Sequence, residues 1–182
     1  MKCLVLSHFD RKNGPKTFIK VGDEIPETYL DEIPRYMDYH DEGYFIHEYG
    51  KIKSANIIFL IPNPLARGGS EIVMISVVLI EENMEPRNFY TTLNQFIENI
   101  KDIDDVQTSF YLNKNKNSGA YETHKKVKNL MWSTYKTLPL KPVYIISDGA
   151  KVLMLNLNKE DNSTLIDFLK KVQNQSTALI NR

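Results

Sequence analysis

Short apolar stretches recur along the first half of the chain, and their pattern predicts β-strands. The two most apolar stretches are residues 54–61 and 71–80, both rich in β-branched side chains. The second is apolar at almost every position, which is typical of a strand buried on both faces of a sheet. Residues 62–70 join the two stretches and contain two prolines and two glycines, as expected for a loop.

Three shorter stretches complete the set of strands expected for one sheet. Residues 2–9 and 17–21 flank an Asn13-Gly14 pair, which readily adopts the positive φ angles of a hairpin turn. Residues 44–49 precede the strand at 54–61 across a Gly50 turn. The last three strands form an antiparallel meander, with 71–80 central beside the N-terminal hairpin and 44–49 at a free edge.

Apolar residues at helical spacing predict helices between and after the strands. Such spacing occurs over residues 26–39, 86–101 and 120–137. Pro34 removes a backbone hydrogen bond and should kink or split the first of these helices. Residues 106–112 fit either a short strand or an extension of the preceding helix.

The C-terminal part of the chain carries a second hairpin signal. Two apolar runs, residues 143–146 and 152–155, flank Asp148-Gly149, and Asn162 or Ser163 is suited to cap a final helix. We therefore expect an α+β fold in which helices sandwich a five-stranded antiparallel sheet. Residues 1–137 form the main domain, and residues 138–182 add a hairpin and a helix that pack on it.

Composition narrows the classes of function. The 182 residues include 23 Lys and Arg against 23 Asp and Glu, so the basic excess of a nucleic-acid-binding surface is missing. Cys3 is the single cysteine, which excludes an internal disulfide and suits a reducing compartment. No stretch approaches the ~20 apolar residues of a membrane span. We expect a soluble, cytoplasmic protein.

Catalytic and cofactor motifs do not stand out in this sequence. The four histidines lack the spacing of a metal site, and no phosphate-binding loop, dinucleotide fingerprint or nucleophile elbow occurs. We expect neither an enzyme nor a bound cofactor.

The order of elements resembles that of the longin fold: two strands, a helix, three strands and two helices. Short phrases add to this likeness, namely Phe9-Asp10 with Gly14-Pro15-Lys16, residues 43–49 (GYFIHEY) and residues 64–69 (PLARGG). They are similar to phrases in longin and roadblock-like proteins of archaea. The roadblock fold is related but differs in the order of its helices.

The resemblance implies an interaction platform in membrane trafficking or small-GTPase regulation. Such domains are non-enzymatic and often dimeric, and they pair through sheet edges or a helix face. We therefore expect a protein partner, such as a small GTPase. The protein itself would reach membranes only through that partner. The candidate interaction residues are Tyr44, Ile46 and Tyr49 on the edge strand, Tyr36 and Met37 on the first helix, and Arg67 in the loop.

Two other functions remain open from the sequence. One is a ligand-binding or enzymatic domain with a pocket between the sheet and its helices, in which loop 62–70 clamps an anion through Arg67 and glycine N–H groups. The other is a structural subunit of a coat-like or tether-like assembly.

Overall fold

Five strands pair into one antiparallel sheet in the order β2-β1-β5-β4-β3, as expected from the sequence. The computed structural model describes residues 1–66, 68–80, 84–111, 118–139, 143–147 and 151–155. The strands of this sheet are β1 (Lys2–Asp10), β2 (Gly14–Gly22), β3 (Gly43–Tyr49), β4 (Ile52–Pro62) and β5 (Ser70–Ile80).

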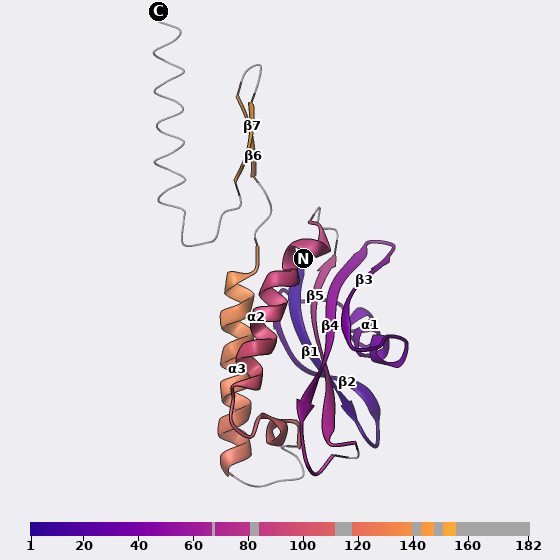
Figure 1. The fold of residues 1–182 in the computed structure, drawn as a ribbon. Coiled ribbons are helices and arrows are strands. Elements are labelled where there is room, and N and C mark those ends of the chain that lie inside the picture. The colour runs from indigo at the N-terminus through magenta and orange to yellow at the C-terminus, as the bar shows by residue number, and fades with distance from the viewer. Residues whose placement is uncertain (67, 81–83, 112–117, 140–142, 148–150, 156–182) are drawn as a thin grey trace, which may run out of the picture. The chain divides into compact units, whose positions relative to one another are not determined.

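Helices lie on both faces of the sheet. Figure 1 shows α2 and α3 side by side along one face and α1 on the other. The helical segments are α1 (Glu27–Leu30), η1 (Ile33–Asp38), η2 (Pro86–Phe89), α2 (Tyr90–Lys101), η3 (Val106–Tyr111) and α3 (Ser118–Thr137), where η marks a 3₁₀ helix.

The strand register explains how the central strands fill two cores. Cys3 pairs with Val78 and Leu4 with Val77, so successive residues of β1 and β5 point to opposite faces. Cys3 and Val78 join the cluster under α1 and η1, together with Leu30 and Ile33. Burying such a side chain contributes about 1.5–3 kcal/mol. The apolar run of β5 therefore serves both faces, as its sequence predicts.

The first helical segment differs in detail from its expected form. The helix predicted at 26–39 is split into α1 and η1, and Pro34 lies in the first turn of η1. A proline is tolerated there because the first N–H groups of a helix have no partner within the helix. Splitting by Pro34 is therefore confirmed, although the second piece is a 3₁₀ helix. Of residues 106–112, for which a short strand or an extension of the preceding helix was expected, Val106–Tyr111 form the separate 3₁₀ helix η3, and residue 112 lies outside the described residues.

The chain divides into two compact units, Met1–Thr137 and Leu138–Arg182. The second unit contains the antiparallel pair β6 (Val143–Ser147) and β7 (Lys151–Leu155), which confirms the two strands of the predicted hairpin. The final helix expected from Asn162 or Ser163 lies outside the described residues. The packing of residues 138–182 on the first unit stays a prediction.

Gly22 provides a test of how α3 packs on the sheet, since it lies where the end of β2 meets α3. Its φ angle is +116°, and a Cβ atom there would lie 2.5 Å from Cε2 of Tyr135 and 2.9 Å from the carbonyl oxygen of Lys2. Gly14 also has a positive φ, but a Cβ atom there would meet nothing within 4 Å. We expect Gly22→Ala to lower the free energy of unfolding by about 1–3 kcal/mol more than Gly14→Ala. Urea denaturation followed by circular dichroism measures both, and equal losses would contradict the contact with Tyr135.

Candidate functional site

β3 is the outermost strand on one side of the sheet. Its inner side pairs with β4 from Gly43↔Ile58 to Tyr49↔Ile52, and no strand in the described part of the chain pairs with its outer side. An edge strand of this kind presents unpaired backbone N–H and C=O groups to a second chain. The candidate site is therefore the outer edge of β3 and the side chains around it.

The opposite edge of the sheet, formed by β2, is better protected against pairing. β2 contains Pro15, Lys16 and Lys20, and its register with β1 shifts between Leu6 and Ser7. Proline, lysine and a bulge are the usual devices by which edge strands avoid pairing. β3 contains no proline and no lysine, so the two edges differ in their capacity to accept another strand.

A groove lies between η1 and His47 of β3. The Tyr36 ring packs on the His47 ring with 4.3 Å between centroids, and the His40 ring stacks on Phe45 at 3.8 Å. Burial and the nearby Glu32 carboxylate raise the pKa of Tyr36. The open groove beside these rings has a volume of about 360 Å³, and it is lined by Glu32, Arg35, Tyr36, Tyr39, His40 and His47.

The other face of β3 is anchored to the second helical layer. The Tyr44 hydroxyl donates a hydrogen bond of 3.2 Å to the carbonyl oxygen of Pro86, and its ring meets the edge of Tyr90. Burial raises the pKa of Tyr44. Ile46 is half-buried and shares this face, because its partner in β4 is Ala55. These contacts hold the edge strand flat against its neighbours.

The remaining candidate residues lie in different surroundings. Tyr49, at the end of β3, is exposed, and Tyr36 is half-buried in the groove. Met37 is only 8% exposed and belongs to the core cluster under η1. Arg67 lies outside the described residues. The structure thus brings Tyr36 together with β3 and places Met37 in the core.

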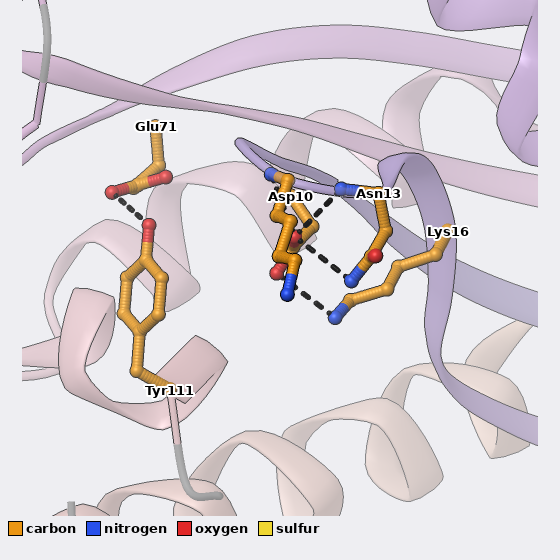
Figure 2. A network of polar contacts seen from close by, with 6 residues as sticks. Asp10, Asn13, Lys16, Glu71 and Tyr111 are labelled. Atoms are coloured by element: carbon orange, nitrogen blue, oxygen red, sulfur yellow. Dashed lines mark hydrogen bonds and ion pairs between the residues drawn. The ribbon is translucent and has the colours of Figure 1, made fainter. Parts of the chain in front are cut away.

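A second polar site lies at one end of the sheet, where the β1–β2 turn is held by Asp10. Its Oδ1 accepts hydrogen bonds from the backbone N–H groups of Lys12 and Asn13, both at 3.0 Å, and its Oδ2 accepts one from Lys16 Nζ at 3.1 Å. Burial by itself would raise the pKa of Asp10, but these bonds and the Lys16 charge lower it well below its ordinary value. Figure 2 shows the carboxylate enclosed by this turn.

Glu71 joins three segments at the same end of the sheet. Its Oε1 accepts a hydrogen bond of 2.6 Å from Asn63 Nδ2. It also accepts one of 2.7 Å from the Tyr111 hydroxyl, which Figure 2 shows. Burial and the bond to Glu71 raise the pKa of Tyr111 to about 12. The β4–β5 loop and η3 are thereby fixed to β5.

An open cavity of about 510 Å³ lies beside this network, lined by Arg11, residues 63–65, and Gln107, Thr108 and Tyr111 of η3. Arg11 Nη2 donates a hydrogen bond of 2.9 Å to the Leu65 carbonyl. Asp10 and Glu71 are 4% and 3% exposed, and both carboxylates make several hydrogen bonds. Their arrangement stabilises the loops at this end of the sheet, while the charged side chain among the residues that line the cavity is Arg11.

Sequence reasoning missed much of both sites. No local sequence pattern indicates the ring contacts of His40 and His47, because these contacts depend on the register of β3 and the path of η1. Asp10 could have been found, because an aspartate before a tight turn often accepts hydrogen bonds from the following N–H groups. Glu71 and Tyr111 are forty residues apart, and no local pattern links them.

The described residues contain no group of three or more His, Cys, Asp and Glu side chains that could hold a metal ion. Within the same residues, no helix combines the length and apolar character that a membrane crossing requires.

The unit Met1–Thr137 has the expected order of two strands, a split helical segment, three strands and two long helices. Its strand order places β5 at the centre, beside the N-terminal hairpin. The fold is longin-like. Among solved structures, the longin-like unit is similar to a K. lactis Lst4 longin domain, with 16% identity, a TM-score of 0.38, and coverage of 75% of this chain and 96% of that one. No protein-family model and no curated protein matches the sequence.

The Asp10 network predicts a pH dependence of stability. Because the folded pKa of Asp10 lies below the unfolded value of about 3.9, its contribution is complete well above pH 4 and is lost as the pH falls through the folded pKa. We expect Asp10→Asn to cost about 1–3 kcal/mol at pH 7 and progressively less between pH 4 and pH 2. Urea denaturation across this range, with exposed Asp104→Asn as the control, measures the difference. A cost independent of pH would contradict the assignment.

Proposed function

We propose that this protein is a non-enzymatic interaction module that binds another protein by adding a strand to the outer edge of β3. The observation that carries the proposal is the contrast between the two edges of one sheet. β2 has the proline, lysines and register shift that discourage pairing, whereas β3 has none of these and continues into an aromatic groove.

The wider proposal is a role in membrane trafficking or small-GTPase regulation, and the longin-like order of the elements supports it. Both faces of the sheet are covered by helices, so a partner can reach the backbone of the sheet only at an edge strand. In this proposal the protein works in the cytoplasm, and it reaches membranes through its partner. Tyr44, Ile46 and Tyr49 lie along the contact, with Tyr36 beside it.

The rival function is a ligand-binding domain that uses the cavity beside Arg11. The volume of about 510 Å³ supports it, since small-molecule sites usually measure about 300–1,000 Å³. Arg11 lines this cavity, whereas Arg67, on which the loop 62–70 hypothesis depends, lies outside the described residues.

The test begins with affinity purification of the full chain, followed by light scattering of the recovered complex on a sizing column. Hydrogen exchange is then compared with and without the purified partner. We expect amides of residues 43–49 to exchange more slowly in the complex, because a new ladder protects them, and amides of residues 14–22 to remain unchanged. The second edge is the internal control.

Two results would contradict the proposal. One is slower exchange at residues 14–22 with none at 43–49. The other is a strict monomer without any protein partner that carries a small molecule in native mass spectrometry, which would favour the rival. Recovery of a small GTPase or of a trafficking subunit as the partner would support the wider assignment.

A further inference from the structure

The segment that leads into β3 is acidic, although the whole chain is neutral. Glu32 lines the groove, and Asp41 and Glu42 directly precede β3, whereas α1 at the start of the segment contacts β2 through Leu30 and Thr17. The segment 27–42 precedes β3 and forms α1, η1 and the turn into the strand. It carries six carboxylates against one guanidinium, that of Arg35, and all seven side chains are exposed. The carboxylates belong to Glu27, Asp31, Glu32, Asp38, Asp41 and Glu42.

From this charge we infer that the strand added to β3 is a basic segment of the partner, with lysine or arginine side chains in the groove beside η1. This inference rests on the proposed use of the β3 edge and specifies the chemistry of its occupant. Complementary charge attracts such a segment and disfavours acidic competitors.

The groove has the side chains that a cation requires. Tyr39 is 79% exposed and Tyr36 is half-buried, so aromatic surface is available at both. A lysine or arginine over the face of such a ring is attracted by the negative charge of its π-electrons. Glu32 lines the same groove and supplies a carboxylate, while Arg35 is the one lysine or arginine among the lining residues.

The alternating pattern of a strand fits this geometry. Phe45 and His47 point toward η1, as their ring contacts with Tyr36 show, whereas Tyr44 points to the other face. Alternate residues of an added strand would therefore lie over the groove. The favoured occupant is a segment with a basic residue at every second position.

A second copy of the chain is a poorer occupant of the same edge. Antiparallel pairing of two β3 strands about a two-fold axis places the same face of both sheets side by side. The β3 strand of a second copy contains no lysine or arginine, so it lacks the basic side chains that the groove is inferred to bind.

The test uses synthetic peptides as long as β3, which has seven residues. One peptide alternates lysine with valine, one alternates glutamate with valine, and one alternates threonine with valine. A fourth alternates lysine with proline, which keeps the charge but cannot form a strand ladder. Fluorescence anisotropy measures binding to the full chain, and hydrogen exchange locates the bound peptide.

Two matched variants separate local charge from total charge. The acidic-surface variant carries Glu32→Gln, Asp38→Asn, Asp41→Asn and Glu42→Gln. The control variant makes the same change in net charge at exposed positions outside this surface, with Glu98→Gln, Asp102→Asn, Asp104→Asn and Glu122→Gln. Tyr39→Ala removes one ring of the groove without any change in charge.

The lysine–valine peptide should bind tightest and slow the exchange of residues 43–49. Its affinity should fall about tenfold in the acidic-surface variant and stay unchanged in the control variant. Tyr39→Ala should weaken it about two- to fivefold.

Each other outcome overturns the inference in a distinguishable way. Equal protection of residues 43–49 by the threonine or glutamate peptide removes the preference for a basic segment but leaves the β3 edge as the binding site. Equal binding of the lysine–proline peptide, or equal loss in both variants, reduces the effect to unspecific attraction. Self-association through residues 43–49 assigns the edge to a second copy. If no peptide protects residues 43–49, the inference of a basic segment is overturned. The hydrogen exchange of the complex with the natural partner then decides whether the β3 edge is used at all.

Discussion

Burial of both faces of the central strands is the constraint on which the rest of the structure depends. β5 pairs with β1 on one side and with β4 on the other, and its side chains are shared between two helical layers. Because neither face of the sheet is left open, a partner can reach the backbone only at the two outer strands. The chemistry of those two strands therefore decides what the molecule can do.

A few residues make the two edges differ in their capacity to pair with another strand. Pro15, two lysines and a register shift make β2 a poor template, and α3 approaches its end closely enough that only glycine fits at position 22. β3 is held in place from both faces, by Tyr44 on one side and by the Tyr36–His47 contact on the other. An ordered strand whose outer edge is unpaired requires little reorganisation when a partner binds.

Much of the fold could be predicted from the sequence, because strand periodicity and turn residues are local signals. The structure confirms three such predictions: the buried strand from the apolar run of β5, the hairpin turn at Asn13-Gly14 and the split of the first helix at Pro34. The groove could not be predicted, since Tyr36 and His47 meet only once η1 takes its path across β3. The links from Glu71 to Asn63 and Tyr111 depend likewise on tertiary packing. Met37 illustrates the same limit, because helical spacing alone does not distinguish a residue on the surface from one in the core.

The most direct measurement of the central claim is nuclear magnetic resonance of the isotope-labelled full chain in complex with its unlabelled partner. The account predicts cross-strand nuclear Overhauser effects between the backbone protons of residues 43–49 and a segment of the partner, which would show that the sheet continues beyond β3. Contacts with the partner confined to β2, to the exposed surface of α3 or to the cavity beside Arg11, with none along β3, would contradict it.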